Sequence, residues 1–253
     1  MSKRATRRTE HAFVAEGCEL LRSALDAGAE IEAIFIAPEG LDDPEVIELS
    51  QRSLDTGARV YGLEPGVMER VSDTVTPQPV LSVVKTIDAD IEVVAKSRLV
   101  IVLVDVRDPG NAGTVMRTVD ASGAAAVIFC GGTVDPYNPK TVRASAGSIF
   151  HVPVILAESA REILDKLSEF GYQVFGTDAH GEIDYVEVDW TRPTALVLGN
   201  EANGLSDQLV ELLDATISIP MVGKAESLNV GIACAVLCFE ALRRVSRRCE
   251  RID

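Results

Sequence analysis

Five polar side chains follow apolar runs in the second half of the chain, close to where three of these runs end. In chain order they are Asn111, Arg117, Glu201, Ser227 and Asn229. Ligands of open α/β sheets sit beyond the carboxyl ends of the strands, so these positions predict a ligand site. Amide, guanidinium, carboxylate and hydroxyl groups can bind and orient a polar substrate. The 3 scattered histidines suggest neither a metal site nor a Ser-His pair.

Each of these polar residues also has a plainer explanation. Asn111 and Ser227 can be N-caps of the helices that follow them. Asn229 can be an ordinary first-turn residue, and Arg117 can be a solvated helix residue. Glu201 lies between two glycines, which suits a simple turn that starts a helix. The loop around Asn111 lacks the G-x-G-x-x-G spacing of a dinucleotide site, which disfavours a nicotinamide enzyme.

The elements that must position these residues alternate between strands and helices. Continuous apolar runs of strand length are typical of parallel strands that are covered on both faces. The predicted strands span residues 99–104, 125–130, 152–156, 173–176, 194–198 and 216–219, and a helix spans 159–170. The last helix, 229–242, is apolar nearly all round, so we expect it to be buried in the protein or in a subunit interface.

The first part of the chain predicts a smaller α/β domain. Residues 1–8 form a basic arm without periodicity, and a helix is expected from Phe13 to a stop at Gly28. An acidic stretch before residue 97 ends this part, so we predict domains at 1–96 and 97–253. Further strands are expected at 31–37, 59–63 and 79–86, and further helices at 43–54 and 65–71.

Composition argues against several classes of protein. The net charge of −15 over 253 residues disfavours a uniformly basic nucleic-acid binder, although both ends of the chain are basic. The 5 cysteines form no C-x-x-C pair, which suggests free thiols and no zinc site. The sequence shows neither an apolar signal segment nor a run of about 18 apolar residues, so we expect a soluble cytoplasmic protein without a membrane span.

Four basic residues are candidates for binding the phosphates of a polyanion. Lys140 and Arg143 lie three residues apart on a predicted helix and would share one face. Arg7 and Arg8 lie in the basic arm. For Lys140 and Arg143, an ordinary solvated surface is the equally simple alternative.

Three segments of the second half occur in a specific order. They are Asn111-x-Gly113-x-x-x-Arg117, Leu198-Gly199-Asn200-Glu201-x-x-Gly204-Leu205, and Ile219-Pro220-Met221 followed by Ser227-Leu228-Asn229-Val230. Together they resemble the signature motifs of the SpoU (TrmH-type) RNA ribose 2′-O-methyltransferases. The first part, with Phe13-Val14-Ala15-Glu16-Gly17 and Leu63-Glu64-Pro65, resembles the ribosomal-protein-like substrate-binding domain of longer members.

The resemblance implies an α/β fold, with a C-terminal SPOUT-type parallel sheet that contains a trefoil knot behind the small substrate-binding domain. It also implies a homodimer. S-adenosylmethionine would be held largely by backbone groups around Leu198, Gly199, Ile219, Met221 and Leu228. The five polar residues named at the outset would surround the ribose and the methyl group. Arginine is a poor proton acceptor, so Arg117 is expected to hold a phosphate and stabilise developing charge.

Members of this family transfer a methyl group to a ribose 2′-hydroxyl of RNA, so RNA is the expected partner and no metal is expected. The additional first domain favours 23S ribosomal RNA, and transfer RNA is the alternative. A non-catalytic RNA-binding protein on the same fold is a further alternative, which the complete set of polar residues disfavours.

Overall fold

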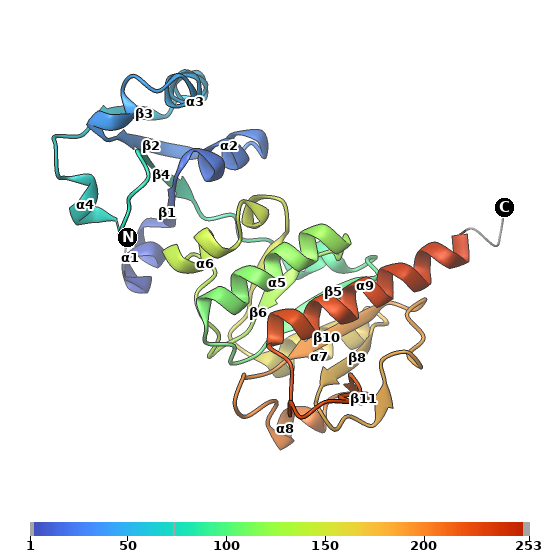
Figure 1. The fold of residues 1–253 in the computed structure, drawn as a ribbon. Helices are drawn as coiled ribbons and strands as arrows, with labels where there is room; N and C mark the ends of the chain where they lie inside the picture. Colours follow the sequence, from blue (N-terminus) through green and yellow to red (C-terminus); the bar gives the residue numbers. More distant parts are fainter. Residues whose placement is uncertain (1–2, 73, 250–253) are drawn as a thin grey trace. The chain divides into compact units, whose positions relative to one another are not determined.

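The computed structural model describes residues 3–72 and 74–249, with the side chains of 247–249 excepted. The chain divides into two compact units (Figure 1). Unit 1 consists of Met1–Ile87 and Asp135–His151, and unit 2 consists of Asp88–Val134 and Val152–Asp253. The segment Asp135–His151 thus belongs to unit 1, although it lies inside the range 97–253 that was expected to form the second domain.

Unit 1 is built on a four-stranded sheet in the order β1-β4-β2-β3. Strand β4 pairs antiparallel with β1 and β2, and β2 pairs parallel with β3. The strands are β1 (Ala12–Glu16), β2 (Ile31–Ile36), β3 (Arg59–Gly62) and β4 (Val80–Lys85). The helices are α1 (Arg4–Glu10), α2 (Cys18–Asp26), α3 (Pro44–Asp55), α4 (Met68–Val71) and α6 (Pro139–Ala144), with 3₁₀ turns at Pro38–Gly40 and Ser148–Phe150.

Two predictions for the start of unit 1 were wrong. The helix expected from Phe13 is preceded by strand β1, in which Phe13 and Ala15 are completely buried on one face. Gly17 then takes a φ of 104°, which a residue with a side chain rarely adopts, and α2 starts after it. Residues 1–8 were expected to be an irregular arm, but residues 4–10 form helix α1. This helix is held by Arg7, whose Nε donates to Asp135 Oδ2 at 2.9 Å.

Unit 2 is built on a seven-stranded sheet in the order β7-β6-β5-β10-β8-β11-β9, and every pairing in it is parallel. The predicted α/β class with a parallel sheet is therefore confirmed. The strands are β5 (Leu99–Leu103), β6 (Val127–Phe129), β7 (Val154–Leu156), β8 (Gln173–Thr177), β9 (Ile183–Asp184), β10 (Thr194–Leu198) and β11 (Ala215–Ser218). The helices are α5 (Pro109–Ser122), α7 (Ala160–Glu169), α8 (Asp207–Val210) and α9 (Val230–Cys249), with a 3₁₀ turn at Ile91–Val94.

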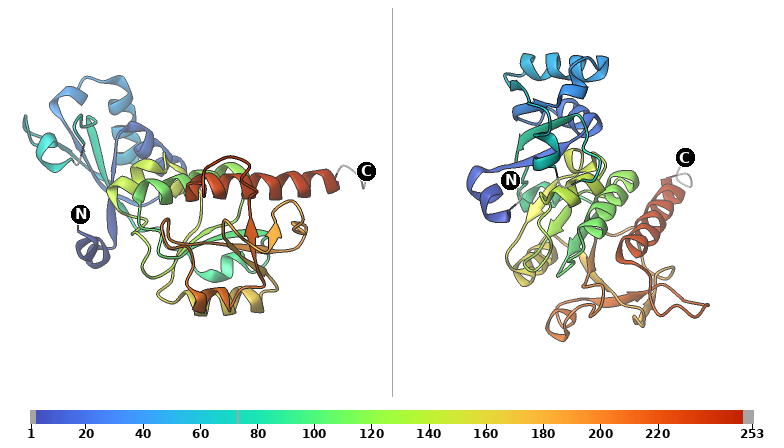
Figure 2. Two further views of the ribbon diagram at one scale, coloured as in Figure 1. Left: turned by 60° about the horizontal axis from the view of Figure 1, so that its bottom comes forward. Right: turned by 60° about the vertical axis from the view of Figure 1, so that its left-hand side comes forward.

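Helices cover both faces of this sheet. Helices α5 and α9 lie side by side on one face, and α7 and α8 lie on the other (Figure 2). Strand β10 is completely buried, and it lies in the middle of the sheet between β5 and β8. This arrangement brings the carboxyl ends of β5, β8 and β10 to one edge, where their loops meet. Among the described residues, no helix is long and apolar enough to cross a membrane.

Candidate active site

A cavity of about 560 Å³ lies at this edge of the unit 2 sheet. Its volume falls in the range of about 300–1,000 Å³ that is usual for small-molecule sites. Most of the residues predicted to be catalytic or cofactor-binding line it. They are Asn111, Gly199, Glu201, Ile219, Met221, Ser227, Leu228 and Asn229. Leu198 is the last residue of β10 and directly precedes Gly199 in the sequence. It is completely buried and does not line the cavity.

Three polar side chains of the cavity form a continuous chain of hydrogen bonds. Asn111 Nδ2 donates to Glu201 Oε1 at 2.9 Å, and Asn111 Oδ1 accepts from Asn229 Nδ2 at 2.8 Å. The central amide thus uses its donor towards one neighbour and its acceptor towards the other. Each of the three predicted motifs contributes one member, so the motifs meet at one place in the folded chain.

The helix starts explain how the two asparagines reach each other. Asp108, not Asn111, is the N-cap of α5, because its Oδ1 accepts from the backbone N–H of Asn111 at 2.9 Å. At α9, Asn229 Oδ1 accepts from Gly231 N at 2.9 Å, so Asn229 occupies the capping position that was expected for Ser227. A Cβ on Gly231 would lie 2.8 Å from Thr114 Cγ2 of α5, so glycine is what allows the two helices to approach here.

The loop after β10 is a tight turn that projects Glu201. Asn200 and Gly204 exchange backbone hydrogen bonds of 3.0 and 2.9 Å, and Asn200 Oδ1 accepts from Ala202 N at 3.0 Å. A Cβ on Gly199 would lie 2.6 Å from backbone atoms of Gly204, closer than real Cβ contacts, so only glycine fits there. The predicted backbone contact of Gly199 with the cofactor stays a prediction.

The family of the chain follows from comparison with known sequences. Residues 98–239 match the SpoU rRNA Methylase family, and residues 1–82 match the MRM3-like substrate binding domain. The chain belongs to the SpoU rRNA methylase family. The first match covers more than half of the chain and contains all three motifs.

Relatives of known sequence and structure agree with this family. The chain is 34% identical over 227 residues to the 23S rRNA (guanosine(2553)-2′-O)-methyltransferase RlmP of Bacillus subtilis, covering 90% of this chain and 87% of that protein. An AdoMet-bound rRNA methyltransferase from Sinorhizobium meliloti superposes with a TM-score of 0.87 at 32% identity, over 96% of this chain and 92% of that one. The SpoU methyltransferase AviRb from Streptomyces viridochromogenes, in complex with AdoMet, gives a TM-score of 0.88 at 29% identity, over 96% and 94% of the two chains.

The cavity in this SpoU family member suits a nucleoside cofactor. Apolar walls come from Ile217, Ile219 and Leu237, and hydroxyl and carboxylate groups come from Thr177, Asp178 and other lining residues. The glycine at position 199 lets backbone atoms form part of the surface, which fits a neutral base better than a charged side chain would. Among the described residues, no cluster of three or more His, Cys, Asp or Glu side chains could hold a metal ion.

Arg117 lies apart from the other predicted catalytic residues of this family member. It is exposed on α5, and it does not line the cavity. Arg117 is six residues after Asn111, which places it about 120° away around the helix axis. It forms no hydrogen bond or ion pair with another side chain in the described part of the chain. Its catalytic role therefore stays a prediction, without support from contacts within one chain.

The predicted RNA-binding residues lie in unit 1, in unlike surroundings. Lys140 and Arg8 are exposed. Arg143 is half-buried, with its Nη1 3.8 Å from Glu16 Oε2. Arg7 differs from the expectation of a free phosphate-binding residue, because only 4% of its side chain is exposed and Asp135 holds its guanidinium. The ion pair ties α1 to the segment before α6, so we correct the role of Arg7 to a structural one.

The prediction from sequence missed part of the cavity. Thr177 lines it from the end of β8, and Asp178 and His180 line it from the loop between β8 and β9. Asp178 Oδ1 accepts from His180 N at 2.7 Å, which shapes this loop. The sequence could have indicated these residues, because they directly follow the predicted strand that ends at residue 176. The carboxyl end of that strand reaches the same edge of the sheet as those of the other strands.

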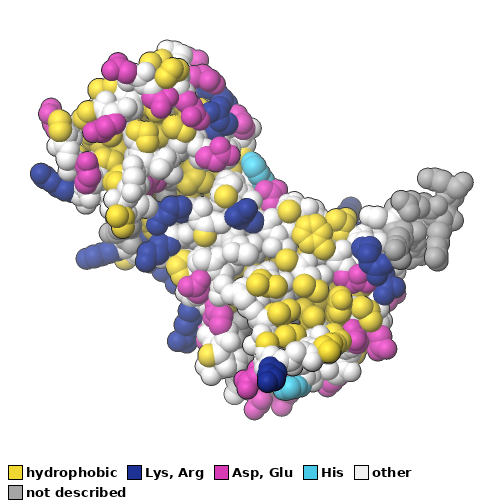
Figure 3. Space-filling model, viewed as in Figure 1, with side chains coloured by type: hydrophobic (Ala, Val, Ile, Leu, Met, Phe, Trp, Pro, Cys, Tyr) yellow, Lys and Arg dark blue, Asp and Glu magenta, His cyan; other side chains and the backbone are white. Residues whose placement is uncertain are grey.

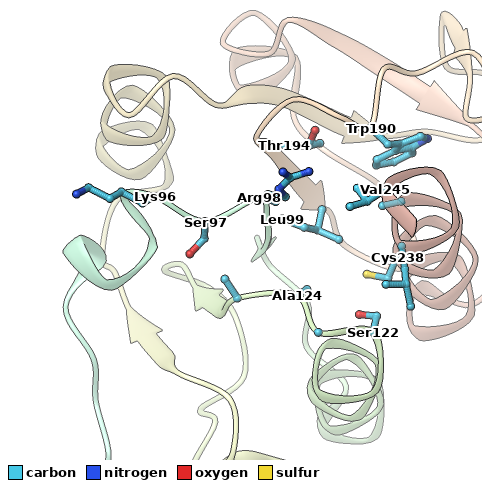
Figure 4. Close-up of a pocket in the computed structure, with 14 residues that line it drawn as sticks. Lys96, Ser97, Arg98, Leu99, Ser122, Ala124, Trp190, Thr194, Cys238 and Val245 are labelled. Carbon is cyan, nitrogen blue, oxygen red and sulfur yellow. The ribbon is translucent and has the colours of Figure 1, made fainter. Parts of the chain in front are cut away.

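A second cavity, of about 310 Å³, lies at the opposite edge of the unit 2 sheet (Figure 4). It is lined by the first residues of β5 and β10, by Trp190, and by Cys238 and Val245 of α9. It contains none of the predicted catalytic or cofactor-binding residues. The candidate active site is therefore the cavity at the carboxyl ends of the strands.

Proposed function

We propose that this protein is an S-adenosylmethionine-dependent RNA methyltransferase that transfers a methyl group to a ribose 2′-hydroxyl, with 23S ribosomal RNA as the favoured substrate. The observation that carries the proposal is the hydrogen-bonded chain from Glu201 through Asn111 to Asn229 at one cavity. Family membership and the relatives named above support it. The names of those relatives include a 23S rRNA 2′-O-methyltransferase and an AdoMet complex.

S-adenosylmethionine supplies a methyl group on a sulfonium, which is a good leaving group. The residues of the chain then have to orient the ribose hydroxyl and accept its proton. Ser227 and Asn229 offer hydrogen bonds from the start of α9, and the Glu201 carboxylate is the proton acceptor beside Asn111. Orientation alone supplies a large part of the rate of such a transfer.

Unit 1 is the proposed RNA-binding part, in agreement with the match of residues 1–82 to a substrate binding domain. Lys and Arg side chains gather over α1 (Figure 3). The proposed phosphate contacts are Arg8 and Lys140, with Arg143 partly occupied by Glu16. Because neutralised phosphates release counterions, RNA affinity should fall steeply as salt concentration rises, despite the acidic composition of the chain.

We also propose a homodimer, formed through the exposed face of α9. Ile232, Phe239 and Leu242 are 54%, 47% and 41% exposed, and they follow one stripe of the helix. Figure 3 shows hydrophobic side chains gathered along this helix. Ile232→Glu with Phe239→Glu should convert a dimer to a monomer in light scattering, whereas Val210→Glu on exposed α8 should not. A monomeric wild-type protein at micromolar concentration would contradict the proposal.

The trefoil knot and a cytoplasmic location stay predictions.

The role of Arg117 has its own test. Arg117→Ala should leave the melting temperature and S-adenosylmethionine affinity nearly unchanged and slow methyl transfer by ~100-fold or more, the scale seen when an electrostatic group is lost. Arg117→Lys should restore little, because a point charge cannot replace a planar fork. Single-turnover methylation with saturating RNA measures both, and activity of Arg117→Ala within about threefold of wild type would exclude the role.

The proposed function is tested by transfer of a labelled methyl group from S-adenosylmethionine to unmodified 23S rRNA and, in parallel, to unmodified tRNA. We expect label in the 23S rRNA. The labelled RNA should resist alkaline cleavage after one nucleotide, the one that carries the methyl group. A substrate with a 2′-deoxy sugar at that nucleotide should accept none. Label only in tRNA would change the substrate class, and no label in either RNA from a protein that binds S-adenosylmethionine would contradict the function.

A further inference from the structure

A strained turn after β5 holds a second arginine beside the catalytic cavity. Asp105 has a φ of 56°, in the left-handed region that favours glycine. Its two carboxylate oxygens accept from Arg107, at 2.9 Å from Nε to Oδ1 and 3.1 Å from Nη2 to Oδ2. A single non-glycine residue in this conformation costs roughly 1 kcal/mol or more. Glycine at position 105 would relieve this strain, but it would lose both contacts to Arg107.

Several contacts keep the turn in place. Asn200 Nδ2, from the loop that carries Glu201, donates to the backbone oxygen of Asp105 at 2.9 Å. A Cβ on Gly132 would lie 3.0 Å from Asp105 Oδ1, so the neighbouring loop leaves room for the carboxylate only because it has glycine there. Asn200 therefore fixes the backbone of Asp105, and the loop at Gly132 packs against its carboxylate, before that carboxylate binds Arg107.

Arg107 is linked to the catalytic carboxylate through its own backbone. The N–H of Arg107 points to Glu201 Oε2 at 3.5 Å, and the N–H of Asp108 points to Oε1 at 3.4 Å. The side chain of Arg107 is 72% exposed, so its charge is presented to solvent, and its backbone N–H lies next to Glu201, which lines the cavity. Hydrogen bonding to Asp105 raises the pKa of Arg107, which keeps the guanidinium charged at every practical pH.

Stability does not explain this arrangement. An exposed ion pair contributes about 0–1 kcal/mol, which at best offsets the strain at Asp105. Orientation of Arg107 does explain it, because the two hydrogen bonds to Asp105 fix an arginine side chain that would otherwise sample many rotamers. The N–H groups of Arg107 that Asp105 does not use are left for an acceptor in solvent.

We propose that Arg107, held by Asp105, binds the RNA phosphate next to the ribose that is methylated. This inference rests on the proposed function. The 2′-hydroxyl and the 3′-phosphate of a nucleotide sit on adjacent ribose carbons, so a hydroxyl placed at Glu201 brings its phosphate to the rim of the cavity. Guanidinium groups recognise phosphate through paired N–H donors. Arg107 is thus a substrate-binding residue, and Asp105 is a positioning residue that acts through it.

The test compares Arg107→Ala, Arg107→Lys and Asp105→Asn, with Arg161→Ala as the control, since Arg161 is an exposed arginine on α7 of the same unit. Asparagine tolerates the left-handed conformation, so Asp105→Asn keeps the turn and removes only the charge. Melting temperature and S-adenosylmethionine affinity are measured first, and both should stay at wild-type values in all four variants. RNA binding and methylation are then measured with 23S rRNA transcribed in vitro.

Arg107→Ala should raise KM for RNA about tenfold with a smaller change in kcat. It should also make the slope of log association constant for RNA against log salt concentration shallower by roughly one unit. Arg107→Lys should keep the salt dependence and still raise KM, because it keeps the charge and loses the fork. Asp105→Asn should also keep the salt dependence, and it should raise KM by about threefold. Arg161→Ala should behave as wild type.

The inference is overturned if Arg107→Ala has the wild-type salt dependence and a KM within about twofold of wild type. Equilibrium binding separates this outcome from failure of the proposed function. If the wild-type protein transfers no methyl group but binds RNA with a salt dependence that requires Arg107, the phosphate site stands and the activity fails. If the wild-type protein methylates RNA and Arg107→Ala binds and reacts normally, the activity stands and the phosphate site fails.

Discussion

Replacement of Asn111 by aspartate tests the centre of the hydrogen-bonded chain. The substitution keeps the shape of the side chain and exchanges an amide donor for a second carboxylate oxygen facing Glu201. The donor and acceptor atoms are now 2.9 Å apart. Two charges at that separation repel by about 6 kcal/mol at an effective dielectric constant of about 20, and by about 1.4 kcal/mol with full solvent screening. Glu201 is exposed, so the lower part of this range applies.

A repulsion of this size moves Glu201 away from the ribose position, so Asn111→Asp should slow methyl transfer by about 10- to 100-fold at neutral pH. The paired carboxyl groups should have one pKa raised, because a like charge disfavours ionisation. As the pH falls through that raised pKa, one carboxyl becomes protonated and can donate to the other. Activity relative to wild type should therefore recover under mildly acidic conditions.

The assay is single-turnover methylation of RNA from mildly acidic to neutral pH, with S-adenosylmethionine affinity measured alongside. Asn111→Ala is the matched variant, since it removes the same hydrogen bonds without adding charge, and it should lose activity with no recovery in acid. Wild-type rates for Asn111→Asp at neutral pH would refute the role of this amide. Identical pH profiles for the two variants would refute the electrostatic explanation.

Three further substitutions test other parts of the structure. Gly199→Ala places a Cβ 2.6 Å from backbone atoms of its own loop, so S-adenosylmethionine affinity measured by calorimetry should fall by about 100-fold. Arg7→Ala leaves the buried carboxylate of Asp135 without its partner and should destabilise unit 1 by about 3 kcal/mol in urea unfolding. The pKa of Glu240 is lowered from 4.5, chiefly by a hydrogen bond from Arg243, so this pair stabilises the fold above that pH and loses its effect as the pH falls. Glu240→Gln should therefore lower the melting temperature at neutral pH and make little difference in acid.

Local sequence patterns were sufficient for most elements of unit 2. The apolar runs at 99–104 and 194–198 correspond to β5 and β10, which are buried in the middle of a parallel sheet. Periodicity succeeds here because burial on both faces leaves a continuous apolar run in the sequence. It failed around Phe13, where a short strand and the start of a helix share one apolar segment and the turn at Gly17 separates them.

The sequence by itself determined which residues can take part in the chemistry, because residue type and motif spacing are local properties. The tertiary structure alone decided which of them meet. Asn111 bonds to Glu201 across 90 positions and to Asn229 across 118, since β10 inserts next to β5 and α9 packs on α5. The same long-range packing buries Arg7 against Asp135 and leaves Arg117 exposed on the far side of its helix. Burial and partner choice depend on contacts between distant segments, which no local pattern of charge or hydrophobicity records.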